Sequence, residues 1–380
     1  MNRAQALPLH RRAILVVGPT PPPFHGVAVA TDQILSSTKL RQEFDLLSLD
    51  TRDRRGLSNI NRLDLTNLTL ALKHGAIFIH LLLTKRPELI YLPISQATLA
   101  FLRDCLFLLP SRVLGKKVVI HLHGSSFRDF YRSASFAIRF LIRHVLRGAS
   151  YIIVLGEDLR TVFSGLVPDE RVRVIPNGIA DFVGETPRPA PPRTIRRVLF
   201  LSSLRREKGI FDVLQAIPEV LRQGSPVVFT FAGEWVGEGD RLLATRLLRD
   251  LGLERAVEFT GPVGPDAKRR LLLESDVFVL PSYMEGQPFA LLEAMCASLP
   301  IVTTRTGAVP ELVDDGFNGF LVDKQRPDQV AGRIRLLLED EGLRSRMGRA
   351  GRERMLDRFT ADRFVGDTTQ IFRDALEDGH

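Results

Sequence analysis

The chain has 380 residues, of which 44% are hydrophobic and 25% charged, and its formal net charge at pH 7 is +8. This length suits two domains of about 150 to 200 residues, and the composition excludes a disordered or collagen-like chain. Aromatic residues make up 7% of the sequence and are mostly phenylalanines within apolar runs, so the basic-aromatic interleaving of a nucleic-acid-binding surface is missing.

The positive charge is concentrated in the first half of the sequence. Residues 1–180 contain 24 lysines and arginines against 13 acidic residues, whereas the remaining residues contain 28 against 31. A basic surface can bind nucleic acid, an anionic membrane or an anionic substrate. Because the aromatic pattern speaks against stacking on bases, we expect no nucleic-acid partner.

The two cysteines and the apolar runs indicate where the protein works. Cys105 and Cys296 lie in apolar runs, with no Cys or His at metal-binding spacing, so we expect buried thiols in a reducing cytoplasm. The apolar run near the N-terminus, about six residues, is too short for a signal peptide. No uninterrupted apolar run reaches the length of about 18 residues that a membrane span needs, so the sequence predicts a cytoplasmic protein.

Strands and helices alternate through the first half of the chain. Residues 13–18, AILVVG, form a continuous apolar run typical of a strand buried in a parallel sheet, and a Gly/Pro-rich loop leads to a helix expected near Gly26. No GxGxxG follows the strand, so a dinucleotide fingerprint is not supported. Further strands are expected near 44–49, at 88–92 and up to Gly124, with helices at 64–84 and 96–109. This alternation predicts an α/β protein with a doubly wound parallel sheet.

Two histidines lie at the end of one predicted strand. His121 and His123 belong to the stretch KKVVIHLHG, and ligands of such sheets bind at the carboxyl ends of the strands. A single histidine at a strand end is more often structural than functional. We expect the two side chains to point to opposite faces of the sheet, with His123 on the ligand side.

Residues 133–147 form a predicted basic amphipathic helix. Arg139, Arg143 and Arg147 recur every four residues, and we place them opposite Phe136, Phe140 and Ile142. The pattern fits an ordinary helix with a solvated basic face, and it also fits a helix lying in the interface of an anionic membrane. A strand at 151–156, a helix and a strand at 171–175 complete the first domain, which we place at residues 1–180.

A second domain follows a proline-rich linker at 181–195. The predicted order strand, loop, helix recurs over 196–360, and the helical tail ends in a segment at 361–380 that is expected to pack back on the first domain. Lys208 and Gly209 open a helix, so a phosphate at that helix could meet Lys208. Trp235 lies in a later loop, where it could stack on a base or simply plug the loop.

The stretch EGQPFALLE, residues 285–293, combines a tight turn with the start of a helix. A predicted strand at 276–282 leads into it, and Pro288 suits the first helical position. The unpaired N–H groups of such a helix terminus suit a phosphate. Glu293 sits among apolar residues, so its carboxylate either needs a partner or faces solvent.

Residues 285–321, EGQPFALLEAMCASLPIVTTRTGAVPELVDDGFNGFLV, closely resemble the Glu-x7-Glu signature of retaining glycosyltransferases of family 4, with the downstream Gly-x-x-Pro-Glu and Asp-Gly-x-Asn-Gly elements. Pro176-Asn177-Gly178 and the His123-Gly124 pair also match that family. The resemblance covers nearly the whole chain. It implies the glycosyltransferase-B fold, with two Rossmann-like domains facing across a cleft: an N-terminal domain for the acceptor and a C-terminal domain for the nucleotide sugar.

The resemblance also implies roles for individual residues. Glu293 would bind the donor ribose, Glu285 the transferred sugar, His123 the same sugar, and Lys208 the leaving diphosphate. The loop and helix start around the donor would comprise Gly286, Gln287, Pro288, Phe289 and Ala290.

Two positions differ from the family pattern. In the glycine pair of the N-terminal loop, His25 replaces the first glycine and Gly26 is kept. At the arginine that grips the diphosphate together with the lysine, this chain has Ser203, so Arg205 or Arg206 would have to take its place.

The resemblance therefore implies a retaining transfer of a hexose from a nucleotide diphosphate sugar to a lipid-linked or polysaccharide acceptor. The sequence contains no Asp-x-Asp, which agrees with an enzyme that needs no metal and no cofactor. Two alternatives stay open: a nucleotide-sugar epimerase or phosphorylase of the same fold, and a non-enzymatic basic protein that binds a membrane or nucleic acid. Peripheral contact with the cytoplasmic face of an anionic membrane is left open as well.

Overall fold

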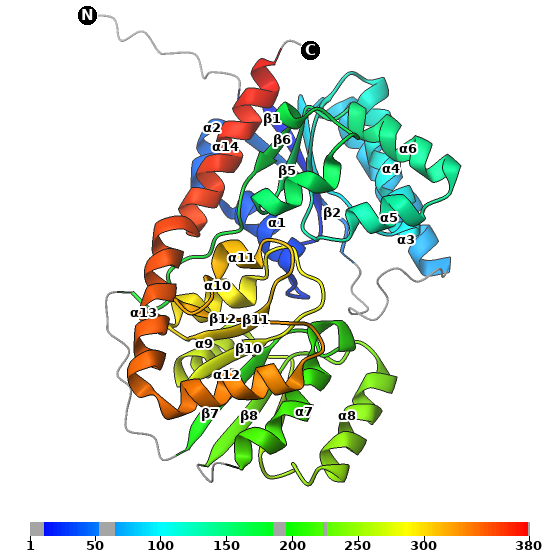
Figure 1. Cartoon of the computed structure of the whole chain (residues 1–380). Helices are drawn as coiled ribbons and strands as arrows, with labels where there is room; N and C mark the ends of the chain where they lie inside the picture. Colours follow the sequence, from blue (N-terminus) through cyan, green and yellow to red (C-terminus); the bar gives the residue numbers. More distant parts are fainter. Residues whose placement is uncertain (1–10, 53–64, 185–194, 223–225, 379–380) are drawn as a thin grey trace, which may run out of the picture. The chain divides into compact units, whose positions relative to one another are not determined.

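The computed structural model describes residues 11–52, 65–184, 195–222 and 226–378 (Figure 1). The chain divides into two compact units. The first consists of the chain up to Val154, Arg160–Ile175 and the chain from Val365 onward, and the second of Leu155–Leu159 and Pro176–Phe364. Most of the predicted linker, 185–194, lies outside the described residues.

Within the described residues, the first unit has a six-stranded parallel sheet with strand order β2-β1-β3-β4-β5-β6. Its strands are β1 (Ala13–Gly18), β2 (Asp45–Asp50), β3 (Leu89–Pro93), β4 (Lys117–His121), β5 (Tyr151–Val154) and β6 (Val172–Val174). Its helices are α1 (Gly26–Ser36), α2 (Thr38–Glu43), α3 (Leu65–Thr84), α4 (Thr98–Val113), α5 (Phe127–Ser133) and α6 (Phe136–Arg147).

The second unit repeats this architecture with a described six-stranded parallel sheet of order β12-β11-β10-β7-β8-β9. Its strands are β7 (Arg196–Leu201), β8 (Val227–Ala232), β9 (Val257–Gly261), β10 (Val277–Leu280), β11 (Ile301–Thr304) and β12 (Gly319–Val322). Its helices are α7 (Ile210–Leu221), α8 (Glu238–Asp250), α9 (Pro265–Glu274), α10 (Phe289–Cys296), α11 (Val309–Leu312), α12 (Pro327–Glu339) and α13 (Glu341–Arg358), and α14 (Ala361–Glu377) begins here.

The predicted parallel α/β architecture is confirmed in both units. The central strands are continuous apolar runs that are buried along their length, as strands covered by helices on both faces must be. Parallel pairing in register, such as Leu280 with Thr303 in β10 and β11, brings the carboxyl ends of neighbouring strands to one edge of each sheet. The loops that leave those ends carry most of the predicted site residues.

Several predicted boundaries were wrong. The strand expected up to Gly124 ends at His121, and the strand expected over 151–156 ends at Val154. A 3₁₀-helix, Glu157–Phe163, replaces the helix expected after it. The helix expected over 133–147 begins only at Phe136, because α5 ends at Ser133 and the Ser135 hydroxyl caps a new start by accepting the N–H of Ile138.

The end of α14 is part of the first unit. Phe372 packs edge-on against the rings of Phe44 and Tyr91, with centroid distances of 6.1 and 5.9 Å. The Arg373 guanidinium donates to both oxygens of the Glu43 carboxylate at the end of α2 and so ties α14 to that helix. The chain from Val365 onward is therefore a built-in element of the first unit rather than an appended tail.

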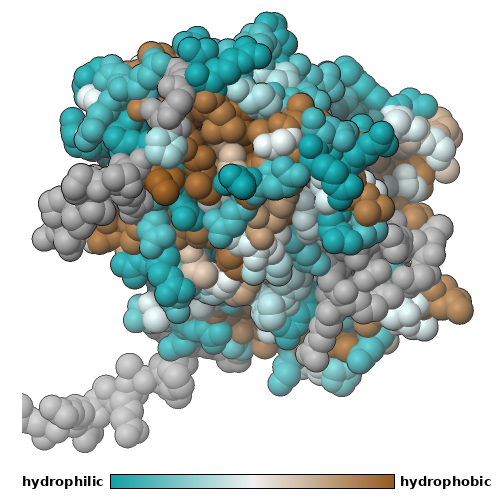
Figure 2. Space-filling model, turned by 90° about the horizontal axis from the view of Figure 1, so that it is seen from below, coloured by the Kyte–Doolittle hydropathy of each residue, from teal (hydrophilic) through white to brown (hydrophobic). Residues whose placement is uncertain are grey.

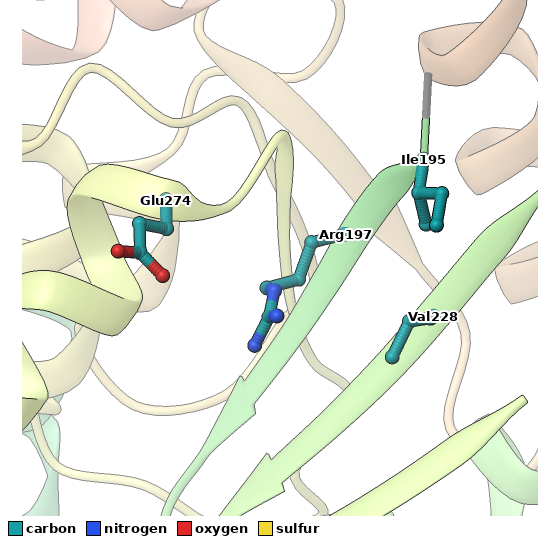
Figure 3. Close-up of a pocket in the computed structure, with 4 residues that line it drawn as sticks. All are labelled: Ile195, Arg197, Val228 and Glu274. Atoms are coloured by element: carbon teal, nitrogen blue, oxygen red, sulfur yellow. The ribbon is translucent and has the colours of Figure 1, made fainter. Parts of the chain in front are cut away.

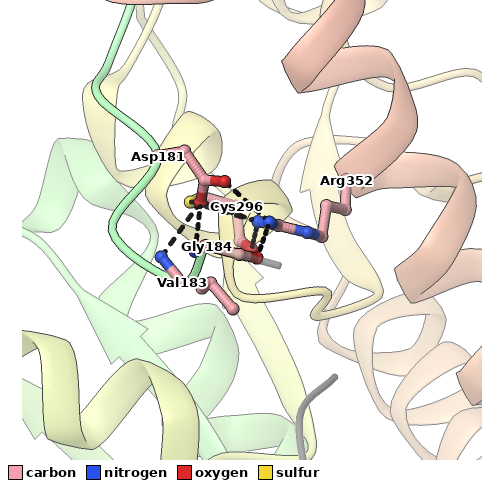
Figure 4. A network of polar contacts seen from close by, with 5 residues as sticks. All are labelled: Asp181, Val183, Gly184, Cys296 and Arg352. Atoms are coloured by element: carbon pink, nitrogen blue, oxygen red, sulfur yellow. Dashed lines mark hydrogen bonds and ion pairs between the residues drawn. The ribbon is translucent and has the colours of Figure 1, made fainter. Parts of the chain in front are cut away.

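A polar network fixes the chain where it enters the second unit (Figure 4). The Asp181 carboxylate accepts hydrogen bonds from the Arg352 guanidinium at 3.0 and 2.8 Å and from the N–H groups of Val183 and Gly184. Arg352 also donates to the carbonyl oxygens of Gly184 and Cys296. These bonds tie the segment to α13 and to the end of α10, and the guanidinium holds the pKa of Asp181 well below its usual range.

We expect Asp181→Asn to lower the free energy of unfolding by about 2 kcal/mol at pH 7, because the charge-assisted bonds to Arg352 are lost. The folded pKa of Asp181 lies below the unfolded value of about 3.9. Its contribution is therefore complete above about pH 4 and is lost as the pH falls through the folded pKa. Urea unfolding should show a smaller gap between wild type and variant at pH 3 than at pH 7.

The exposed Asp357, also at α13, supplies the control for this experiment. Asp357→Asn should change the free energy of unfolding by less than about 0.5 kcal/mol at either pH. An Asp181→Asn effect that is equal at both pH values would contradict the assignment to the ionised carboxylate.

Candidate functional site

Glu285 and Lys208 form a nearly buried ion pair in the second unit. The Lys208 ammonium donates to a Glu285 carboxylate oxygen at 2.6 Å, and the two side chains are 14% and 9% exposed. Lys208 ends a 3₁₀ turn before α7, and Glu285 follows β10. The structure therefore brings together two residues that are far apart in the sequence and that were assigned to the leaving diphosphate and to the transferred sugar.

The two loops that carry this pair are held against each other by backbone contacts. The N–H of Tyr283 donates to the carbonyl of Glu207 at 2.8 Å. Gly209 lies so close to Pro281 that an added Cβ would stand 2.2 Å from the Pro281 carbonyl oxygen, and its φ of +75° also favours glycine. The spacing of Lys208 from Glu285 is thus set by main-chain packing and not by flexible side chains alone.

A third loop, which follows β11, packs against the backbone of Glu285. Gly307, with φ +52°, packs so tightly that a Cβ would lie 2.0 Å from the carbonyl oxygen of Glu285. The next residue, Ala308, donates its N–H to the carbonyl of Gly286 at 2.8 Å. This explains in physical terms why a glycine stands in the Gly-x-x-Pro-Glu element.

Gln287 lies in the turn and holds the Pro-Asn-Gly segment. Its side-chain oxygen accepts the N–H of Asn177 at 2.5 Å, and its carbonyl accepts the Asn177 side-chain amide at 2.9 Å. Both residues are buried. Two sequence elements that the resemblance picked out separately are therefore one hydrogen-bonded unit.

The helix that starts after this turn, α10, has an open N-terminus. Pro288 was predicted as its first helical residue, but it is the N-cap, with φ −73° and ψ 126°. The prediction was wrong by one position because the extended ψ of Pro288 keeps it outside the helix. No described side chain caps this terminus, so the N–H groups of Phe289 and Ala290 are in place for an anion.

Glu293, one turn into α10, has a partner that the sequence reasoning missed. Its carboxylate forms a salt bridge with the Lys268 ammonium of α9 at 2.5 Å. Burial raises the pKa of Glu293, while the nearby ammonium opposes that rise. Lys268 stands beside two arginines, Arg269 and Arg270, in the sequence, and no pattern singles it out; only the need of Glu293 for a cation signalled that a partner exists.

The loop after β7 distinguishes the two candidate arginines. The backbone N–H of Arg206 donates to the Asp240 carboxylate at 3.0 Å, and the Arg206 guanidinium lies 3.9 Å from that carboxylate and 5.3 Å from the centroid of the Phe211 ring. The exposed Arg205 side chain has no hydrogen bond or ion pair within the described chain. Ser203 lies in this same loop. Arg205 is therefore the cation that is available here.

Trp235 packs inside the second unit. Its ring lies 5.4 Å from the ring of Phe259, and its backbone pairs with Leu204. It is partly buried against the hydrophobic core. This packing favours the plug over the base-stacking alternative.

The predicted histidines lie together in the first unit. The rings of His121 and His123 are 3.8 Å apart, so the prediction that they point to opposite faces was wrong. Side chains two residues apart along a strand point to the same face, which is why the rings of His121 and His123 meet. His121 is bound by the Tyr91 hydroxyl at 2.7 Å. Both ring nitrogens of His123 are buried without a hydrogen-bond partner in the described chain, and burial lowers the pKa of His123 to about 3.

His25, the residue in the place of the first loop glycine, caps α1. Its Nδ1 accepts the N–H of Ala28 at 3.4 Å, so the neutral ring carries its proton on Nε2. Burial lowers the pKa of His25, and repulsion between the protonated forms of the two rings adds to the effect of burial in lowering the pKa of His123. Gly26, the kept glycine, is the first residue of α1.

A shallow pocket of about 370 Å³ lies elsewhere in the second unit (Figure 3). It is lined by Ile195, Arg197, Val228 and Glu274, at the amino-terminal ends of β7 and β8 and the end of α9. Ligands of parallel sheets bind at the carboxyl ends of the strands, the opposite edge, so the pocket does not belong to the predicted site.

In Figure 2, hydrophobic residues gather toward the upper middle of the view with hydrophilic ones around them. Apolar atoms make up a large part of the surface of any folded protein.

Two family models match nearly the whole chain. Residues 34–181 match the model described as Glycosyltransferase Family 4, and residues 187–354 match the model described as Glycosyl transferases group 1. The chain belongs to the family 4 glycosyltransferases. The predicted family is thereby confirmed, whereas the Glu-x7-Glu signature of residues 285–321 stays a prediction.

Curated relatives of this glycosyltransferase match parts of it. Spore coat protein SA of Bacillus subtilis is 33% identical over 181 residues, which are 46% of this chain and 48% of the relative. N-acetyl-alpha-D-glucosaminyl L-malate synthase of Bacillus anthracis is 30% identical over 182 residues, 48% of this chain and 46% of the relative. The chain spans about half the length of these curated relatives.

Among solved structures, Anabaena Alr3699/HepE in complex with UDP-glucose resembles the glycosyltransferase over 95% of this chain and 99% of its own, with a TM-score of 0.75 and 20% sequence identity. At that identity the likeness shows the fold. The predicted fold class, two Rossmann-like units of the glycosyltransferase-B type, is confirmed.

No three His, Cys, Asp or Glu side chains gather into a possible metal site in the part of the glycosyltransferase that the structure describes. Cys105 and Cys296 are buried and free, and burial raises the pKa of these thiols to about 12 and about 11.

Proposed function

We propose that the protein transfers a hexose from a nucleotide diphosphate sugar to a glycan or lipid-linked acceptor, with retention at the anomeric carbon. The observation that carries the proposal is the Lys208–Glu285 ion pair, at 2.6 Å, in the loops that precede α7 and α10. The family match supports sugar transfer over an epimerase or a non-enzymatic binding protein.

The reaction breaks the bond between the sugar anomeric carbon and the donor phosphate oxygen. A bond forms from the acceptor hydroxyl oxygen to that carbon, and the acceptor proton passes to the leaving diphosphate. Negative charge therefore grows on the leaving group while positive charge grows on the sugar. Lys208 and the N–H groups at the start of α10 stabilise the negative charge on the leaving diphosphate. The Glu285 carboxylate stabilises the positive charge on the sugar. We assign the donor ribose to Glu293 and the sugar to His123 as well.

Cations and a helix terminus supply the stabilisation that a metal ion gives in other enzymes, so we propose that neither a metal nor a cofactor takes part. Arg205 is the proposed second cation on the diphosphate, because Arg206 is already engaged by Asp240 and Phe211. We place the reaction in the cytoplasm, where nucleotide sugars are made available to such an enzyme.

The test is a thermal-unfolding screen with UDP, GDP and ADP. A nucleotide that binds the native fold at 100 times its Kd raises the stability by about 2.7 kcal/mol, which shifts Tm by about 5 °C or more for units of this size. We expect such a shift from one nucleotide, and we expect Glu293→Gln to weaken it because the ribose contact is lost. HepE was crystallised with UDP-glucose, so UDP is the first to try.

The matched control is Glu341→Gln, a change at an exposed carboxylate of the same unit. It should leave the nucleotide-induced shift unchanged. If none of the three nucleotides shifts Tm, and no labelled sugar passes from its nucleotide to a membrane extract, the proposed function is wrong.

A further inference from the structure

Three helices of the first unit pack side by side and carry apolar side chains that are exposed within the described part of the chain. The rings of Phe78 in α3 and Phe107 in α4 meet at 5.1 Å, and the Arg112 side chain of α4 donates to the His144 carbonyl of α6. Figure 1 shows these helices grouped in the first unit. Their outward surface is called the α3–α4–α6 face below.

The outer side of α3 is apolar along its length. Leu65, Leu68, Leu72 and Leu83 lie at spacings of three, four and eleven residues, on one side of the helix, and each is more than half exposed, with Leu65 at 82%. The helix contains no acidic residue. Exposed leucines in a row are a contiguous apolar stripe and not scattered surface residues.

Among the described helices, α3 alone is long and apolar enough to cross a membrane, and 11% of its most apolar 18-residue stretch is buried. The sequence criterion missed it because Lys73 and two histidines interrupt the apolar run. α3 nevertheless packs Phe78 and Leu82 into the core and connects β2 with β3. Crossing a membrane would tear it from the sheet, so the structure favours a helix that lies on a surface.

Helix α6, which packs against α4, carries further exposed aromatic and basic side chains. Phe136 and Phe140 are 82% and 65% exposed, so the prediction that they lie opposite the arginines was wrong. Positions 136, 139, 140, 143 and 147 fall within one third of the helical circumference, and all of them are exposed. Phenylalanines and arginines therefore share one face.

The stretch of chain that contains these three helices has an excess of basic residues. Residues 65–150 contain 12 lysines and arginines and three acidic residues, Glu88, Asp104 and Asp129. Asp104 is buried and paired with Arg103, and Glu88 is paired with Arg12. A second copy of this chain would oppose like charge to like charge, whereas an anionic bilayer offers the complementary charge.

We propose that the α3–α4–α6 face docks on the surface of an anionic phospholipid bilayer. Leu65, Leu68, Leu72, Phe136 and Phe140 enter the boundary between headgroups and acyl chains, and the arginines of α6 bind lipid phosphates. The inference deepens the proposed function, on which it rests: a lipid-linked acceptor would be met by a protein already lying on its membrane.

Vesicle flotation tests the docking. The full chain is mixed with vesicles of phosphatidylcholine alone or with 30% phosphatidylglycerol, about the fraction that gives a markedly anionic surface. We expect binding to the anionic vesicles that weakens as salt is raised, because salt screens the charges. Phe136→Ser with Phe140→Ser should lower the partition coefficient at least about tenfold, and Arg139→Gln, Arg143→Gln and Arg147→Gln together should lower it about a hundredfold.

Matched exposed positions on α8 of the second unit provide the controls. Leu242→Ser and Arg246→Gln replace side chains of the same kinds at exposed sites and should leave the partition coefficient unchanged. Equal binding to neutral and anionic vesicles, or unchanged binding of the α6 variants, would overturn the docking. So would light scattering showing a wild-type dimer that the Phe136→Ser, Phe140→Ser variant makes monomeric, since the face would then be a self-interface.

The nucleotide screen is read in the same samples without vesicles. A normal nucleotide-induced Tm shift together with absent flotation refutes docking and leaves sugar transfer standing. Flotation with neither a nucleotide-induced Tm shift nor transfer of labelled sugar refutes sugar transfer and leaves a membrane-binding protein.

Discussion

A Lys208→Met enzyme should transfer sugar about 100 to 1000 times more slowly than the wild type, as is typical when one preorganised group that stabilises transition-state charge is lost. Methionine keeps the length of the side chain and removes the ammonium that lies 2.6 Å from Glu285. Because the charge on the diphosphate grows during bond breaking, kcat should fall more than KM rises. Initial rates over a range of donor concentrations give both constants.

The control is Lys324→Met, which removes an exposed lysine from the same unit and should leave both constants unchanged. Lys208→Met also leaves the nearly buried Glu285 without its partner, which can destabilise the fold. Adding Glu285→Gln to Lys208→Met removes that unpaired charge. If the double variant regains the wild-type Tm, the lost stability came from the unpaired carboxylate and not from the lysine itself. Because Glu285 is itself assigned to the sugar, the rate is judged on Lys208→Met alone, per folded protein and below its Tm; a rate within threefold of the wild-type value would contradict the proposed role of Lys208.

Gly307→Ala should lower the free energy of unfolding by about 3 kcal/mol or more. Its φ of +52° strains any side chain, and the new Cβ would lie 2.0 Å from the backbone oxygen of Glu285. The loop must then shift, and Glu285 shifts with it. Urea unfolding measures the stability, and sugar transfer by the fraction that stays folded measures the displacement of Glu285.

Gly252 supplies the matched control, because its φ is +65° but nothing lies within 4 Å of an added Cβ. Gly252→Ala should lower the free energy of unfolding by about 1 kcal/mol, because only the backbone strain of a positive φ is added and no steric clash. Equal effects at the two glycines would show that the contact with Glu285 does not matter.

The fold could be predicted from the sequence to a large extent, because each buried strand is an uninterrupted apolar run between loops. The strand expected at 88–92 and the helix expected at 64–84 lie where the structure has β3 and α3. The errors fell at element ends, where a single residue decides. Pro288 takes an extended ψ, and Ser135 starts a new helix by capping it. The spacing of hydrophobic residues along the sequence predicts neither feature.

The site could be predicted less completely, because contacts between distant loops depend on how the sheet is ordered. Glu285 and Lys208 were selected separately, and only the adjacency of β7 and β10 places them together. The role of Lys268 as the partner of Glu293 could not be predicted, because the sequence of α9 is that of an ordinary charged helix. The orientation of His121 was recoverable from the two-residue strand period, which places it beside His123.

Because Phe372 of α14 completes the packing around Phe44 and Tyr91, the first unit is assembled from both ends of the described chain. During synthesis α14 leaves the ribosome after the strands of both sheets, so the rings of Phe44 and Tyr91 lack this contact until then. A domain that must wait for a later segment to complete its packing exposes apolar surface during that time. Expression of residues 1–180 by themselves should therefore yield aggregated or degraded material, even though they contain a complete sheet.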